Sequence, residues 1–169
     1  MNATFGVEIK RPAWQTIAIF ALGFWLSGSL ILDLVIMPGM YTAGMMNQAG
    51  FATAAYSIFW IFNRIELLCA ALVLASLLAL RGPSNLYHHV RRWSLFLGVS
   101  LLAIAIIYTY IMTPQMSALA VQLNLFEPVT QMPAQMISMQ EGYWLLEVTK
   151  LTISATLLGW CYRDSRRFA

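Results

Sequence analysis

The sequence has little charge of either sign. Only 10% of its 169 residues are Asp, Glu, Lys or Arg, whereas 60% are hydrophobic, and the mean hydropathy is +0.69. In soluble domains about a quarter of the residues are charged. This shortage of charge excludes an ordinary soluble domain and predicts an integral membrane protein that contacts the lipid bilayer.

Cysteine and histidine are also scarce. The two cysteines, Cys69 and Cys161, are expected at different depths, so we expect neither a disulfide nor a thiolate metal site. The two histidines, His88 and His89, lie in a basic loop, so a haem held by two histidines within the membrane is unsupported. Phosphate loops, nucleophile elbows and paired carboxylates in a soluble active-site setting are also missing, and no enzymatic activity is predicted.

Four stretches are long and apolar enough to cross a hydrocarbon core of roughly 30 Å, for which about 20 residues suffice. They are approximately residues 14–37, 54–80, 93–112 and 143–162. The sequence therefore predicts one all-α domain over residues 1–169, a four-helix transmembrane bundle.

Prolines predict where two of these helices end. Pro38 should end the first helix and Pro114 the third, because proline lacks an N–H and clashes with the preceding turn. Residues 40–47 are too few to span, and residues 115–126 carry apolar side chains at helical spacing. We expect the first segment to be re-entrant or interfacial and the second to be a short interfacial helix, both on the outer side.

Basic residues predict the orientation of the chain. They precede the first span, lie between the second and third, or follow the fourth: Lys10, Arg11, Arg81, Arg91, Arg92, Arg163, Arg166 and Arg167. The positive-inside rule places all three segments, and so both termini, in the cytoplasm. Because these residues sort by membrane side, the net charge of +3 does not indicate nucleic-acid binding.

Polar residues interrupt the predicted spans and form a candidate charge cluster of Asp33, Asn63, Arg64, Glu66, Glu147 and Lys150. A charge at bilayer depth costs at least about 2.5 to 3.5 kcal/mol, so each needs a partner, a cavity or water. Counting about 1.5 Å of rise per residue places Asp33, Arg64 and Glu147 at one level near the outer boundary. Glu66 and Lys150 lie slightly deeper by the same count.

This cluster predicts specific ion pairs. Arg64 is expected to pair with Asp33 or Glu147. Lys150 is expected to pair with Glu66 or Glu147. The pairs could hold the helices in register; alternatively, the surplus carboxylate could mark a cation or proton site open to the outside.

Methionine is confined to the outer side of the predicted topology. Apart from Met1, the methionines are Met37, Met40, Met45, Met46, Met112, Met116, Met132, Met136 and Met139. A thioether is a soft, uncharged ligand that selects Cu(I), so these residues form a candidate metal site. The alternative is that methionine serves as an adaptable apolar filler or as a surface for a partner.

Three motifs carry a resemblance to a known family: Gly23-Phe24-Trp25-Leu26-Ser27-Gly28, Met37-Pro38-Gly39-Met40-Tyr41, and residues 59–66. With them the chain resembles small four-helix membrane proteins built on a domain of unknown function, related to the eukaryotic transmembrane protein 205 group. The resemblance implies a four-helix bundle and, for the eukaryotic group, an association with tolerance of a soft-metal drug. The chain is also distantly similar to copper-resistance membrane proteins and membrane protoporphyrinogen oxidases, although it lacks the intramembrane histidines that oxidase chemistry requires.

Three functions follow from these patterns. The first is a non-enzymatic protein that binds or passes a soft metal ion, Cu(I), through the outer methionines above the charge cluster. The second is an accessory or assembly subunit, whose outer surface docks on a membrane protein partner or on a second copy of the chain. The third is a proton-coupled small carrier that uses Glu147 and Lys150.

Overall fold

The computed structural model describes residues 10–45, 50–80, 88–118 and 134–165, and these residues are helical apart from short turns. The first helix, α1 (Lys10–Ile31), continues through η1 (Leu32–Ile36) and α2 (Met37–Thr42). The second long helix is α3 (Phe51–Ala79), and the third, α4 (His88–Ile107), continues through η4 (Tyr108–Met112). The last helix is α6 (Ala134–Ser165). The described part of the chain contains no strand, which confirms the prediction of an all-α protein.

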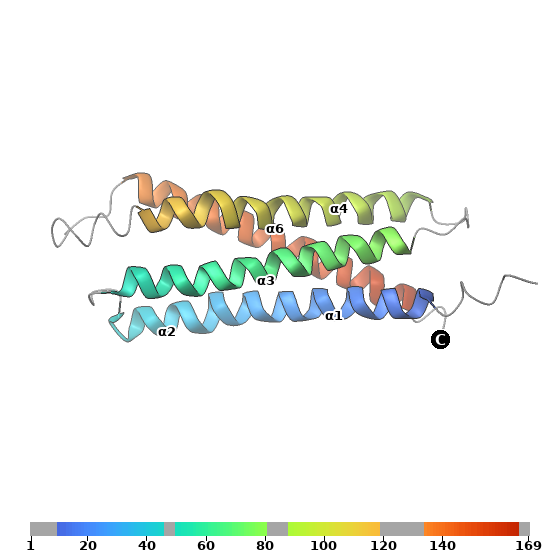
Figure 1. Ribbon diagram of the computed structural model, residues 1–169, viewed down its shortest axis with the longest axis horizontal. Coiled ribbons are helices and arrows are strands. Elements are labelled where there is room, and N and C mark those ends of the chain that lie inside the picture. The colour runs from blue at the N-terminus through green and yellow to red at the C-terminus, as the bar shows by residue number, and fades with distance from the viewer. Residues whose placement is uncertain (1–9, 46–49, 81–87, 119–133, 166–169) are drawn as a thin grey trace, which may run out of the picture.

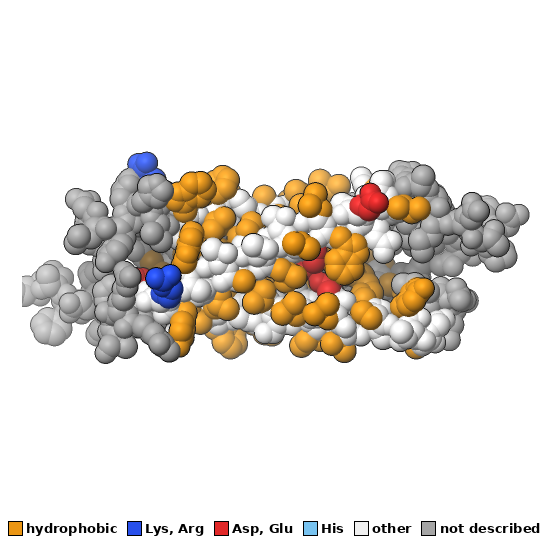
Figure 2. All heavy atoms as spheres, turned by 180° about the vertical axis from the view of Figure 1, so that it is seen from behind, with side chains coloured by type: hydrophobic (Ala, Val, Ile, Leu, Met, Phe, Trp, Pro, Cys, Tyr) orange, Lys and Arg blue, Asp and Glu red, His pale blue; other side chains and the backbone are white. Residues whose placement is uncertain are grey.

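The four long helices lie side by side, with α6 crossing obliquely behind the others (Figure 1). α1 and α4 each contact both α3 and α6. The start of α1 and the end of α6 lie at the same end of the molecule (Figure 1). On the face shown in Figure 2, basic side chains gather at that end and acidic side chains appear between apolar ones near the middle.

Three helical stretches are long and apolar enough to cross a membrane: Ala13–Thr42, Thr53–Ala79 and Arg92–Ala118. Together with their apolar outward surfaces, they support the predicted membrane location and contact with lipid. The fourth predicted span, residues 143–162, is helical within α6 but is not among these three. Its buried Glu147 and Lys150 and its several threonines lower its hydropathy, so the crossing of α6 stays a prediction.

Neither Pro38 nor Pro114 ends a helix, so both predicted helix ends are wrong. Each proline follows a π-helical turn, η1 or η4, and the helix continues beyond it. The N–H of Met37 bonds to the carbonyl of Leu32, five residues back. The corresponding bond in η4 joins the N–H of Thr113 to the carbonyl of Tyr108. Proline cannot donate the usual backbone hydrogen bond, and the wider π-helical turn before it accommodates this loss. The helix therefore continues past the proline instead of ending.

The predicted outer segments are therefore partly helical continuations of the spans. Residues 40–42 belong to α2, residues 43–45 form a turn, and residues 46–47 lie outside the described part of the chain. Residues 115–118 continue the helix of α4 and η4, whereas residues 119–126 lie outside it.

The apolar core occupies the half of the molecule where α1 begins and α6 ends. Leu22, Val73, Leu101 and Leu157 are completely buried there, one from each long helix. These side chains exclude water from that half of the molecule. The buried charged residues lie farther along the helices, in the other half.

Candidate functional site: a buried carboxylate and lysine cluster

Lys150 lies at the centre of the cluster, between two carboxylates. Its Nζ is 2.5 Å from Glu66 Oε1 and 2.8 Å from Glu147 Oε1, and none of the three side chains is more than 3% exposed. α6 supplies Lys150 and Glu147, three residues apart on one face, and α3 supplies Glu66. The predicted pairing of Lys150 is thus confirmed with both of its candidate partners.

Glu66 is fixed by donors from α1 as well as by Lys150. Trp25 Nε1 donates to Glu66 Oε1 over 2.9 Å, and Ser29 Oγ donates to the same oxygen over 3.1 Å. With Lys150 Nζ, three donors converge on one carboxylate oxygen. These three donors fix the position of the Glu66 carboxylate between α1 and α6.

Glu147 has a weaker set of partners. The hydroxyl of Tyr108 lies 3.1 Å from Glu147 Oε2 and also 3.1 Å from the backbone carbonyl of Tyr143. A phenol has one hydrogen, so it can donate to only one of these acceptors at a time. Glu147 Oε1 forms an ion pair with Lys150, whose Nζ lies 2.8 Å away.

Asp33 completes the cluster from η1. The hydroxyl of Tyr143 donates to Asp33 Oδ1 over 3.2 Å, whereas Asp33 Oδ2 is buried and accepts no hydrogen bond. Asp33 is only 5% exposed and interacts directly with Glu147. Two buried carboxylates therefore face each other, and Asp33 Oδ2 has no hydrogen-bond donor.

Charge does not balance among these residues. Asp33, Glu66 and Glu147 carry three negative charges when ionised, against one positive charge on Lys150. An uncompensated buried charge is strongly unfavourable, because desolvation costs several kcal/mol per ion. The cluster therefore requires added positive charge, supplied by protons or by a bound cation.

The π-helical turns place two members of the cluster. Asp33 lies in η1 and Tyr108 lies in η4, and each turn is followed by a proline at the same spacing, Pro38 or Pro114. π-helical turns inside α-helices are frequent at functional sites. The sequence analysis missed Tyr108, Trp25 and Ser29, and the matched prolines were the signal that could have drawn attention to Tyr108.

Arg64 lies outside the cluster, and its predicted pairing with Asp33 or Glu147 is wrong. Its side chain is exposed, and its guanidinium carbon lies 3.9 Å from the centre of the Trp60 ring. Glu66 is two residues away and turned into the protein, so the same helix turn directs Arg64 outward.

Asn63 is buried beside the cluster and joins α3 to the outer part of α4. Its Nδ2 donates to Thr113 Oγ1 over 2.6 Å, and its backbone carbonyl accepts from Thr109 Oγ1 over 3.5 Å. Asn63 therefore has a structural contact of its own and does not touch the carboxylates through these bonds.

The candidate methionine ligands divide into described and undescribed residues. The described side chains are partly or largely exposed: Met37, Met40, Met45, Met112, Met116 and Met139. Met46 and Met132 lie outside the described residues, as does the side chain of Met136. No group of three or more His, Cys, Asp and Glu residues suited to a metal occurs in the described chain. Met112 is a described methionine that approaches another long helix, with its methyl group near Gly142 of α6.

Comparison of the chain with family models, with curated proteins and with solved structures finds no match. The resemblance to the transmembrane protein 205 group therefore stays a prediction, and the function is argued below from the cluster alone.

Proposed function

We propose that this chain is a four-span membrane protein in which Asp33, Glu66, Glu147 and Lys150 form a proton-exchanging site, and that it acts as a proton-coupled small carrier. The carrying observation is that two buried carboxylates, Asp33 and Glu147, lie together and that Asp33 Oδ2 accepts no hydrogen bond. Ionisable residues inside membrane spans commonly belong to proton relays.

The division of roles follows from the partners of each residue. Glu66, held by Lys150, Trp25 and Ser29, is the fixed anion that compensates Lys150. Asp33 and Glu147 are left as the exchanging pair, which holds one proton between two oxygens that would otherwise repel each other. Loss of that proton leaves a buried charge whose neutralisation by an incoming cation would couple proton release to solute binding.

The distribution of polar residues along the helices favours proton exchange between the cluster and the outer side of the membrane. Tyr143, half-buried at the outer end of the cluster, contacts Asp33. In the opposite direction lies the apolar core around Leu22, Val73 and Leu101, where no carboxylate or amine is buried among the described residues. A carrier would need that apolar layer to open before the proton could reach the cytoplasm.

Proton entry into reconstituted vesicles tests the proposal. With an inside-negative potassium diffusion potential and a pH dye inside, wild-type protein should acidify the interior faster than protein-free vesicles. Glu147→Gln should return the rate to that of protein-free vesicles, whereas Glu141→Gln should leave it unchanged, because Glu141 is exposed on the same helix. Equal rates for wild type and Glu147→Gln would contradict the proposed role of Glu147.

A second candidate is the capture of Cu(I) by outer methionines. The contact of Met112 with Gly142 supports it, because Met139 lies three residues before Gly142 on the same face of α6. A thioether pair from two helices would suit a soft monovalent metal. Titration of purified protein with Cu(I) against a competing chelator tests it. Equal affinity in wild type and in a variant with Met112→Leu and Met139→Leu would remove these ligands.

A further inference from the structure

Arg64 is a cation on the lipid-facing surface of the molecule. Its side chain is exposed, and the surrounding exposed residues on α3 are apolar: Trp60, Ile61, Ile65 and Leu68. The interaction found for it within the described chain is with the Trp60 ring. Among the described carboxylates, Asp33, Glu66 and Glu147 are turned inward, and Glu141 and Asp164 lie near the two ends of α6.

The depth of Arg64 places it within reach of lipid headgroups. It lies 17 residues before Arg81 in the sequence, which corresponds to roughly 25 Å along the helix, near the outer boundary of a hydrocarbon core of about 30 Å. Trp60 lies one turn farther out, where tryptophan commonly marks the membrane interface. Helical side chains point toward the N-terminus of their helix, which for α3 is the outer end, so the guanidinium extends toward the headgroups.

The geometry of the guanidinium leaves its hydrogen-bond donors available. The guanidinium carbon lies 3.9 Å from the centre of the Trp60 ring, and such a cation–π contact does not use up the N–H donors of the group. A planar fork of donors matches two oxygens of a phosphate group. The ring fixes the plane of the fork, which reduces the freedom lost when a phosphate binds.

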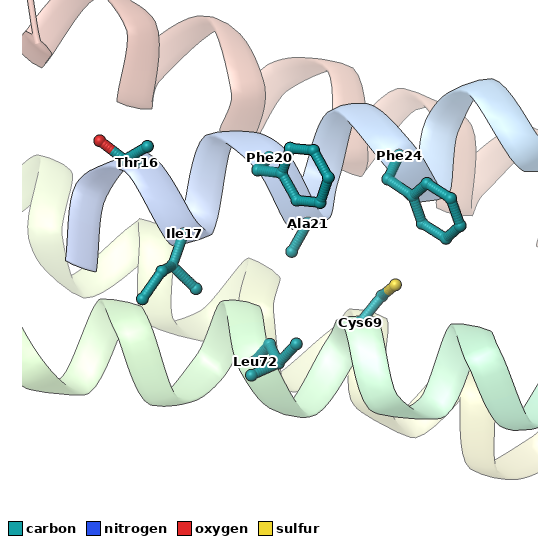
Figure 3. A pocket seen from close by; sticks show the side chains of 7 residues that line it. All are labelled: Thr16, Ile17, Phe20, Ala21, Phe24, Cys69 and Leu72. Carbon is teal, nitrogen blue, oxygen red and sulfur yellow. The ribbon is translucent and has the colours of Figure 1, made fainter. Parts of the chain in front are cut away.

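A hollow suited to an acyl chain lies on the inner side of Arg64. It lies between α1 and α3, and its volume is about 400 Å³. In Figure 3 Phe20 and Phe24 of α1 lie opposite Cys69 and Leu72 of α3. Leu68, 65% exposed, continues the apolar surface from Arg64 toward this hollow. A lipid whose headgroup binds Arg64 would thus have its acyl chains pointing toward the centre of the membrane, as in the outer leaflet.

We propose that Arg64 binds the phosphate of an outer-leaflet phospholipid, with Trp60 orienting the guanidinium and an acyl chain lying along Leu68 into the hollow between α1 and α3. The occupant is a phospholipid because the surface combines a phosphate-binding fork with an apolar hollow placed farther into the membrane. This site is separate from the carboxylate cluster, and its failure would leave the proposed proton exchange untouched.

Lipid retention by purified protein tests this site. Delipidated protein in mild detergent is mixed with phosphatidylglycerol or with diacylglycerol carrying the same chains, and bound lipid is counted by native mass spectrometry. Wild type should prefer phosphatidylglycerol by about tenfold or more, because charge-assisted hydrogen bonds to phosphate are strong. Arg64→Gln should abolish the preference, and Arg64→Lys should keep only part of it, because lysine cannot form the planar fork.

Controls distinguish the sources of the effect. Arg163→Gln removes another arginine, near the end of α6, and should leave the preference intact. Inorganic phosphate should not displace the lipid, because it lacks the acyl chain that fills the hollow. An unchanged preference in Arg64→Gln with an unchanged melting temperature would overturn the proposal. So would conversion of a dimer to a monomer by Arg64→Gln without any change in bound lipid, because that would make a second copy the partner.

Discussion

At the scale of single residues, the carboxylates of the cluster differ in how many hydrogen bonds they accept. Glu66 Oε1 receives three donors, whereas Glu147 Oε1 faces Lys150 alone and Asp33 Oδ2 accepts no hydrogen bond. The ring of Tyr143 lies 5.1 Å from that of Tyr108, and its hydroxyl donates to Asp33. These two tyrosines therefore connect the carboxylates of η1 and α6 through hydrogen bonds that can be removed one at a time.

Tyr143→Phe tests the hydrogen bond to Asp33. The change keeps the ring, including its edge-to-face contact with Phe59, and removes only the donor. The free energy of unfolding should fall by about 1 to 3 kcal/mol, because a buried acceptor loses its partner. Unfolding in detergent micelles measures the change. Tyr110→Phe is the matched control and should cost less than about 0.5 kcal/mol, because surface changes rarely matter; Tyr110 is 65% exposed. Equal effects of the two variants would contradict the role of Tyr143.

Sequence reasoning predicted part of this arrangement and missed the rest for a physical reason. Glu147, Lys150 and Ser154 form a buried polar stripe on one face of α6, and their helical spacing in the sequence indicates such a face. Counting residues gave the height of Arg64 but not the direction of its side chain. That direction follows from the buried face of α3, because Asn63, Glu66 and Ala70 lie at helical spacing and Arg64 lies opposite them.

At the scale of the elements, the two π-helical turns govern how α1 and α4 present their polar residues. Each turn precedes a proline, and the missing N–H and bulky ring of that proline favour the wider turn. The sequence contains both prolines, but propensity alone predicts a helix end at each. The π-helical turns absorb the missing bond and let both helices continue, which a proline in a local pattern does not reveal.

Pro38→Ala tests whether the first turn positions Asp33. The change restores an N–H and removes the ring, so η1 can return to ordinary α-helical bonding and shift Asp33 relative to Tyr143. Tyr143→Phe should then cost less in the Pro38→Ala background, with a coupling of about 0.5 to 3 kcal/mol between contacting groups. Unfolding of the four proteins of the double-mutant cycle measures this coupling.

Pro12→Ala is the matched control for this cycle. Pro12 lies in the first turn of α1, where a helix needs no N–H from proline, so no coupling to Tyr143 is expected. The same cost of Tyr143→Phe with and without Pro38 would show that the π-helical turn does not place Asp33.

At the scale of the whole molecule, an apolar half and a polar half are built from the same helices. Three helices carry enough apolar surface to span a membrane, and α6 carries both Glu147 and Lys150. The all-helical fold followed from hydropathy and helical spacing. The crossing of α6 rests on its packing against α1 and α4, which encloses its polar stripe and leaves apolar residues such as Leu145 and Val148 on its exposed face.

Cysteine labelling tests the four-span topology. Gln131→Cys precedes α6 and Ala169→Cys follows it, so the two positions should lie on opposite sides of the membrane. In vesicles with the outer face exposed, a membrane-impermeant maleimide should label the first directly and the second only after permeabilisation. Ser84→Cys, in the predicted cytoplasmic loop, should behave like Ala169→Cys.

The native Cys69 and Cys161 are buried, so their labelling should be slow. Labelling of Gln131→Cys and Ala169→Cys from the same side would contradict a crossing by α6.

The central claim is that Asp33 and Glu147 share an exchangeable proton, and infrared spectroscopy tests it most directly. The carbonyl stretching band of protonated carboxylic acids is recorded in reconstituted wild type over a pH series. A band present at low pH should disappear as the pH rises, and both Asp33→Asn and Glu147→Gln should remove it, whereas Glu141→Gln should not. A spectrum without a pH-dependent band, or with a band that survives both substitutions, would contradict the account.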